Sequence, residues 1–318
     1  MAAGTTTSSP YAERKRPLVT RTDLLGYLFI SPWLIGFLAF SLLPFVASFL
    51  LSFTDWNIVG QWHWVGAQNY AKMFSGVDDR FVVSLVNTVY YAALVVPGDQ
   101  IIALALALLL NKRGPGIAVY RTLFYIPAIA SGVGTAYLWA QIFSSHGGLL
   151  NAALDLIGIE GPNWLYSLTW SMPALIIVGL WNVGTPMLIY LAALQGVPQS
   201  LYDAASVDGA NTLRKFFHVT IPMVTPAMFF NVVLGFIGAF QVFTIAYVIT
   251  NGGPANATLF YSLYLYTVAF RNLRMGYAAA LAWVLFLIIL AITAVQLVTA
   301  RLWVYYEGSS PGTVAGPR

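Results

Sequence analysis

Six long apolar stretches dominate this chain and leave few folds open to it. They run over residues 24–53, 85–110, 121–143, 172–194, 226–250 and 277–303. A helix of about twenty mostly apolar residues crosses about 30 Å of hydrocarbon. Only 8% of the 318 residues are charged, whereas soluble domains carry about 25%. We therefore predict an all-α integral membrane protein with six transmembrane helices, the first of them kinked or tilted because it contains two prolines, Pro32 and Pro44.

The placement of lysine and arginine predicts the orientation of the spans. With a cytoplasmic amino terminus, eleven basic residues fall on the inner side, and four fall outside: Lys72, Arg80, Arg271 and Arg274. Cytoplasmic loops are enriched in basic residues, so we expect both termini in the cytoplasm and the spans in the cytoplasmic (inner or plasma) membrane. Residues 1–23 are polar and lack a cleavable signal pattern. We expect a disordered cytoplasmic tail at 1–23, a six-span domain at 24–303 and a second cytoplasmic tail at 304–318.

A polar segment separates the fourth and fifth apolar stretches and carries the signals of two short helices. Ser200 followed by Asp203 is a weak capping box for the first helix. Gly209 suits the left-handed residue after that helix. Asn211 can cap a second helix, and we expect Pro222 to end it.

This segment, residues 195–226, resembles the cytoplasmic "EAA" coupling loop of permeases from binding-protein-dependent ABC importers, the maltose-type sugar group in particular. The residues that carry the resemblance are Tyr202, Asp203, Ala204, Ala205, Asp208, Gly209, Ala210, Phe216, Phe217 and Pro222. Asp203 stands where the family usually has Glu, which keeps the charge but shortens the reach. A second match, Thr250-Asn251-Gly252-Gly253-Pro254, is similar to the outward Gly-Gly-Pro turn of sugar permeases. The alternative is an amphipathic loop that only packs on the ends of its own helices.

The resemblance implies the type I ABC importer permease fold and a subunit that translocates a sugar or sugar-like solute, including the glycerol phosphate class, by alternating access. It implies as partners a second permease, two ATP-binding cassette ATPase subunits and an extracytoplasmic solute-binding protein. The chain has no Gly-x-x-x-x-Gly-Lys-Ser/Thr phosphate loop. ATP and Mg are therefore expected in the ATPase partners, with no catalytic residue, cofactor or metal in this chain. A non-transporting membrane scaffold or a passive channel is the alternative.

Polar and aromatic residues inside the fourth and fifth spans are the candidates for a solute pathway, because polar groups in hydrocarbon usually face a bundle interior or water. They are Trp181, Asn182, Thr185, Asn231, Phe240, Gln241, Phe243 and Thr244. Amides, hydroxyls and aromatic faces are the groups that bind sugars, although the same residues can simply pack helices together. Asp99 is the only carboxylate well inside a span. It is either a proton-relay or cation site, or a carboxylate bonded within a helix kinked by Pro97 at a subunit seam.

Overall fold

The computed structural model describes residues 21–112 and 114–305, so most of the predicted tails, 1–23 and 304–318, lies outside the described residues. The chain divides into two compact units, residues 1–50 and 51–318. The first unit holds the helix α1 (Arg21–Phe37), a π-helical turn η1 (Leu38–Leu42) and nearly all of α2 (Leu43–Leu51). Its apolar part, Leu25–Leu51, is 27 residues with a mean hydropathy of 2.4, which is long enough to span a bilayer.

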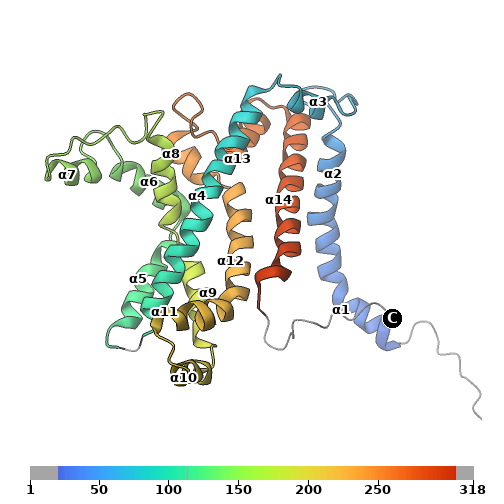
Figure 1. Cartoon of the computed structure of the whole chain (residues 1–318). Coiled ribbons are helices and arrows are strands. Elements are labelled where there is room, and N and C mark those ends of the chain that lie inside the picture. The colour runs from blue at the N-terminus through green and yellow to red at the C-terminus, as the bar shows by residue number, and fades with distance from the viewer. Residues whose placement is uncertain (1–20, 113, 306–318) are drawn as a thin grey trace, which may run out of the picture. The chain divides into compact units, whose positions relative to one another are not determined.

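The second unit is helical, and its only β pairing among the described residues is two isolated bridges. Its elements are α3 (Gln68–Phe74), α4 (Asp79–Leu110), α5 (Ile117–Ile129), α6 (Gly132–Ile142), α7 (Leu149–Asp155), α8 (Ser171–Leu180), α9 (Gly184–Gln195), α10 (Gln199–Val207), α11 (Thr212–Lys215), η2 (Phe216–Thr220), α12 (Ile221–Phe240), η3 (Ala246–Thr250), α13 (Tyr261–Tyr266), η4 (Thr267–Arg271) and α14 (Met275–Trp303). The long helix α4 packs against α8, α9 and α12, and it forms the centre of this unit (Figure 1).

The six predicted spans correspond to five apolar helices and one bent pair of helices. The described residues contain five helices that are long and apolar enough to cross a membrane. The third predicted span, residues 121–143, is instead two helices, α5 and α6, bent by 99° at Ala130 and Ser131. The count reaches six when this pair is taken as one broken span.

The prediction that Pro222 ends a short helix was wrong. The helix that begins at Thr212 continues through η2 into α12 and ends at Phe240, so the fifth span runs over Thr212–Phe240 and not over 226–250. The π-helical turn ends at Thr220, directly before Ile221 and Pro222, so the hydrogen-bond register changes where proline has no N–H to donate.

A second proline in the same helix is accommodated by a side chain. Pro226 cannot donate to the carbonyl of Pro222, four residues earlier. The hydroxyl of Thr225 donates to that carbonyl instead, at 2.6 Å. The same Thr225 oxygen accepts from the backbone N–H of Tyr305 at 2.9 Å, which ties the segment after α14 to α12.

The buried core of the second unit consists of two clusters separated along α4. Val95 and Val96 belong to the larger cluster, which includes α8, α13 and α14. Ala103 and Ala107 belong to the smaller one, with α9 and α12. These two alanines are fully buried one helical turn apart, which allows the backbones of neighbouring helices to approach closely. The stretch of α4 between the clusters contains Asp99.

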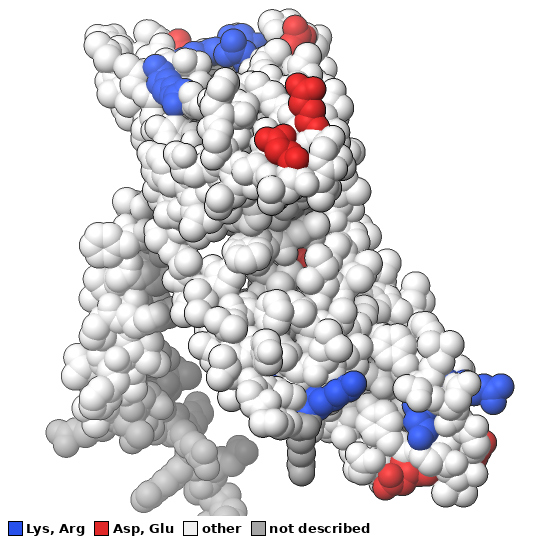
Figure 2. Space-filling model, turned by 90° about the vertical axis from the view of Figure 1, so that its left-hand side faces the viewer, with Lys and Arg blue, Asp and Glu red and all other residues white. Residues whose placement is uncertain are grey.

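Charged side chains gather at the two ends of the second unit, and a wide band of other residues lies between them (Figure 2). The coupling-loop helix α10 lies at one end, and α3 and α13 lie at the other (Figure 1). This distribution is that of a membrane protein whose middle band faces lipid or partner subunits.

Candidate functional site

The helix α10 forms the tip of the polar segment 195–226 and is largely exposed. It has Pro198 at its N-cap, and no side-chain cap bond forms there. The predicted capping box is therefore absent, and Asp203 instead accepts a hydrogen bond from Nε2 of Gln199 at 3.2 Å. Gly209 has φ of +73°, which confirms the predicted left-handed residue after the helix. The side chain of Asn211 accepts from the N–H of Arg214 at 2.9 Å, which confirms the predicted cap of the next helix.

Two side-chain contacts tie α10 to the helix that leads into the fifth span. The hydroxyls of Tyr202 and Thr220 are hydrogen-bonded at 3.0 Å. Nζ of Lys215 donates to Oγ of Ser206 at 2.6 Å. Both partners, Thr220 and Lys215, belong to the continuous helical segment 212–240, so these contacts join α10 to the fifth span.

The surface of α10 carries apolar side chains toward solvent. Val207 is 89% exposed and Leu201 is 39% exposed. The alanines at 204 and 205 leave a shallow surface between them, since neither fills the space with a long side chain. Of the other coupling-loop residues, Asp208 and Phe217 are exposed, and Ala210 and Phe216 are half-buried. An exposed apolar helix with small residues is a surface that another protein can approach.

Two spans lose their helical backbone, and the fifth span ends, around one cavity, which we call the break cavity. The α5–α6 break occurs at Ala130 and Ser131, the α8–α9 break at 181–183, and the break after α12 at 241–243. The break cavity has a volume of about 230 Å³. Its walls include Ala130, Trp181, Asn182 and Val242, so all three breaks reach it.

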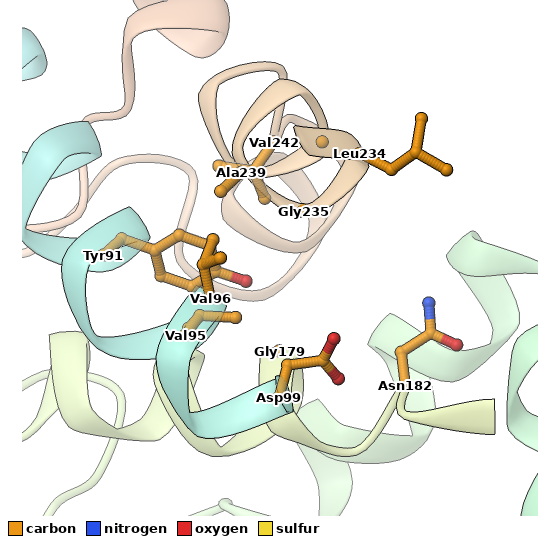
Figure 3. A pocket seen from close by; sticks show the side chains of 11 residues that line it. Tyr91, Val95, Val96, Asp99, Gly179, Asn182, Leu234, Gly235, Ala239 and Val242 are labelled. Carbon is orange, nitrogen blue, oxygen red and sulfur yellow. The ribbon is translucent and has the colours of Figure 1, made fainter. Parts of the chain in front are cut away.

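A second cavity, which we call the Asp99 cavity, adjoins the first. Its volume is about 250 Å³, and it shares Tyr91, Gly179, Asn182 and Val242 with the walls of the break cavity. Its other lining residues are Val95, Val96, Asp99, Leu234, Gly235, Gly238 and Ala239. The carboxylate of Asp99, the amide of Asn182 and the hydroxyl of Tyr91 point into the gap that faces α12 (Figure 3).

Glycines on three helices allow α4, α8 and α12 to approach one another closely around the Asp99 cavity. A Cβ at Gly179 would collide with the hydroxyl of Tyr91, and one at Gly235 would lie 3.1 Å from Cγ1 of Val96. Gly98 packs equally closely, because a Cβ there would lie 2.8 Å from Cδ2 of Leu180. The close approach of α4 to α8 and α12 depends on these positions having no side chain.

Two of the eight predicted pathway residues, Trp181 and Asn182, line these cavities. Asn231 is buried and donates to the carbonyl of Pro186 at 3.3 Å, which is a packing contact between two spans. Phe240 is buried in the larger core cluster. The remaining four lie beside the breaks: Thr185 and Gln241 are exposed, and Phe243 and Thr244 are half-buried.

The sequence did not predict most of the residues that line the cavities, which include Tyr91 and a set of small or β-branched residues. Tyr91, Gly179, Gly235 and Val242 carry no amide, carboxylate or charged group that would mark them, although Val242 directly follows Gln241. Asp99 could be singled out in the sequence, because a carboxylate within a membrane span is rare. Its side chain makes no hydrogen bond or ion pair with any of the described residues, so the intrahelical bond considered for it is not formed there.

The Gly-Gly-Pro turn lies at the opposite end from α10. Asn251 and Gly252 have φ of +50° and +85°. The hydroxyl of Thr258 donates across the turn to the carbonyl of Gly253 at 2.6 Å, and Nδ2 of Asn87 donates to the carbonyl of Asn256 at 2.9 Å. The second bond holds the turn against α4.

Asp78 joins three helices at the same end. It caps α4 by accepting from the N–H of Phe81 at 3.2 Å, and its other oxygen accepts from the hydroxyls of Tyr264, at 2.6 Å, and Tyr277. Burial raises the pKa of Tyr264 above its ordinary value, so its hydroxyl stays protonated and can donate. No group of three or more metal-ligating side chains is found in the described part of the chain.

Comparison with known proteins covers nearly the whole chain. The family described as "Binding-protein-dependent transport system inner membrane component" matches residues 24–304. The probable ABC transporter permease protein YesP of Bacillus subtilis is 43% identical over 300 residues, which are 93% of this chain and 96% of YesP. The trehalose/maltose transport system permease protein MalF of Thermococcus litoralis is 34% identical over 88% of this chain and 95% of its own length.

A solved structure supports the fold. A chain of a bacterial ABC transporter involved in the import of the acidic polysaccharide alginate superposes with a TM-score of 0.78, covering 88% of this chain and 96% of that chain. At 23% sequence identity this likeness concerns the fold, which is that of the type I importer permeases. With a family match over 24–304 and a relative at 43% identity, the chain belongs to the inner-membrane permeases of binding-protein-dependent ABC transport systems, which are transport subunits and not enzymes.

Proposed function

We propose that this chain is one permease subunit of an ATP-driven importer that carries a sugar or sugar-like solute through the break cavity and the Asp99 cavity. The observation that carries the proposal is that two interrupted spans and the end of the fifth span meet at one cavity, which the side chain of Asn182 lines. Non-helical backbone at membrane depth is stable only where it is buried in protein or lines a water-filled space. Transporters commonly place their solute sites at such interruptions. The named solutes of the relatives, trehalose/maltose and diacetylchitobiose among them, support a sugar.

The partners we propose follow from the family. A second permease completes the pathway, two ATPase subunits bind the loops at the α10 end, and a solute-binding protein docks at the α13 end. A bacterial alginate transporter in this fold class has been solved with its oligosaccharide-bound periplasmic protein. In this arrangement α10 and both chain termini face the cytoplasm of a prokaryote, residues 24–303 form the membrane domain, and the coupling residues are those that carry the family motif.

The contacts of α10 suggest how ATPase closure moves the solute path. Closure displaces α10, and the Tyr202–Thr220 and Ser206–Lys215 contacts carry the displacement into the segment 212–240. The far end of that segment is the break at 241–243, where Val242 lines both cavities. A shift of this span therefore changes the cavity walls directly, as alternating access requires.

Purification of the assembly and reconstitution into proteoliposomes test this function. The chain is extracted from its native membrane in a mild detergent, and the co-purifying proteins are identified by mass spectrometry. We expect a second permease and an ATPase with a phosphate loop. In proteoliposomes that hold this assembly and its binding protein, we expect uptake of a radiolabelled sugar only when ATP is present.

The other outcomes separate the alternatives. A chain that purifies alone and binds no added ATPase contradicts the coupling role of residues 195–226 and favours a scaffold. Sugar flux that continues without ATP favours a passive channel.

A further inference from the structure

The carboxylate of Asp99 lies in the proposed solute path and has no partner of opposite charge among the described residues. It lies within α4, between the two core clusters, where a charged group is costly unless it meets a partner or water. Among the described residues no lysine, arginine or histidine pairs with it, and no hydrogen bond to it is formed. The groups nearest its open side are neutral: the hydroxyl of Tyr91 and the amide of Asn182 (Figure 3).

A neighbouring amide also lacks a protein partner at this level. Oε1 of Gln100 accepts from the hydroxyl of Tyr190 at 2.6 Å. Nε2 of the same side chain is buried and has no hydrogen-bond partner among the described residues. It lies 3.9 Å from where a Cβ of Gly235 would be, and Gly235 lines the Asp99 cavity. Unsatisfied buried donors are rare, and this one lies behind the wall of the Asp99 cavity, because Gln100 itself lines neither cavity.

We propose that Asp99 makes this cavity a subsite that admits neutral or amino-bearing sugars and excludes anionic ones such as uronates and sugar phosphates. The inference rests on the proposed transport function and narrows its substrate class. A carboxylate accepts hydrogen bonds from two neighbouring sugar hydroxyls, and Asn182 can donate to or accept from a third. An anionic solute at the same place meets a like charge inside a membrane span, where the effective dielectric constant is lower than in bulk water and the repulsion is therefore stronger.

The first test measures the electrostatic potential of the cavity without using a solute. The chain contains no cysteine, so Val242→Cys introduces a unique thiol on this chain in the wall of both cavities. Its modification rates by a trimethylammonium and by a sulfonate methanethiosulfonate reagent are compared in the complete transporter, with and without ATP. Each rate is divided by that of a free thiol in solution.

We expect the cationic reagent to be favoured, with the ratio of the two rates falling about tenfold when Asp99→Asn is added. Asp99→Glu should keep the ratio, because the charge is retained. A ratio that Asp99→Asn leaves unchanged, or a thiol that neither reagent reaches in either state, overturns the inference. The first result would mean that the carboxylate is protonated or paired with the partner permease, and the second that the cavity is closed to water.

The second test asks whether the charge selects the solute. Uptake of a neutral disaccharide, an amino disaccharide and a uronate disaccharide is measured in proteoliposomes with the same binding protein at saturation. The ratio of uronate to neutral uptake is compared between the native chain and Asp99→Asn, so that the contribution of the binding protein cancels. We expect this ratio to rise about tenfold or more in the variant.

An unchanged ratio overturns the substrate selection, and so does a native transporter that carries the uronate as fast as the neutral sugar. The thiol measurement requires no sugar transport. If the native assembly moves none of these solutes, the sugar proposal fails, whereas the charge of the cavity is still decided by the thiol ratio.

Discussion

Gly209 is the second residue after α10, and its backbone has a left-handed conformation that residues with a side chain rarely adopt. Its φ is +73°, yet a Cβ at this position would meet no atom within 4 Å. A substitution therefore acts through the backbone and not through crowding. Substitutions at Gly209 therefore test the backbone conformation of the coupling loop without adding a steric clash.

We predict that Gly209→Val uncouples the transporter, whereas Gly209→Asn largely preserves it. A β-branched residue with positive φ costs on the order of 1–3 kcal/mol, and asparagine tolerates the left-handed region. ATP hydrolysis and sugar uptake in proteoliposomes measure the effect, and immunoblotting of membranes controls for insertion. Equal activity of the two variants would show that the turn conformation is irrelevant to coupling.

Asn182 lies in the walls of both cavities, whereas Gln241 lies at a break without lining either one. We predict that Asn182→Ala raises the KM for sugar uptake about tenfold, because one hydrogen bond to a solute hydroxyl is lost. Gln241→Ala should have the smaller effect. Initial uptake rates over a range of solute concentrations provide the comparison. Native kinetics in Asn182→Ala would assign this residue to packing instead.

The helical segment 212–240 connects the coupling helix to the solute path. Its π-helical turn ends two residues before Pro222, and η1 in the first unit ends two residues before Pro44. In both places a wider π-helical turn precedes a proline, which cannot donate a backbone hydrogen bond, and the helix continues after the proline. At Pro44 and Pro222 the helix therefore changes its hydrogen-bond register and does not end.

We predict that Tyr202→Phe lowers the amount of sugar imported per ATP severalfold while ATP hydrolysis continues. The variant removes only the hydroxyl that bonds Thr220, so α10 keeps one of its two side-chain contacts with the span, Ser206–Lys215, and is held less firmly. Thr220→Val should have the same effect, and the double variant should be no worse than either single one, because all three remove one contact. Tyr166→Phe, at an exposed tyrosine outside the contact, serves as the control. Additive losses would contradict the link.

In the assembly that we propose, the soluble partners dock on the surfaces at the two ends of this chain. Charged side chains occupy both ends, and α10 presents apolar and acidic residues at one of them (Figures 1 and 2). The partners that we propose at the two ends differ, so a charge change at one end should affect one partner and spare the other.

We predict that Asp203→Lys reduces the co-purification of the ATPase at least tenfold, because the exposed carboxylate on α10 is replaced by the opposite charge. Asp155→Lys, the same change at an exposed residue that ends α7, should leave ATPase capture unchanged. Quantitative mass spectrometry of the purified assemblies compares the two. Loss of the ATPase in both variants would indicate general instability and not a docking contact.

Much of this fold can be predicted from the sequence, because the features that determine it depend on residues close together in the chain. The apolar stretches that became α4 and α14, the cap at Asn211 and the left-handed Gly209 each depend on residues within a few positions of one another. Local hydropathy and turn chemistry are enough to predict such features.

The sequence does not predict the position of the proposed solute path, because that position depends on which breaks in the helices lie next to one another in space. The breaks at Ala130 and Val242 interrupt sequences that remain apolar, so hydropathy continues through them without a change. Asn231 and Asn182 look alike in the sequence, yet one is buried against Pro186 and the other faces a cavity. Packing decides between these environments, because a polar group in a span is stable either bonded to a neighbouring helix or facing water, and the choice depends on residues far away in the chain.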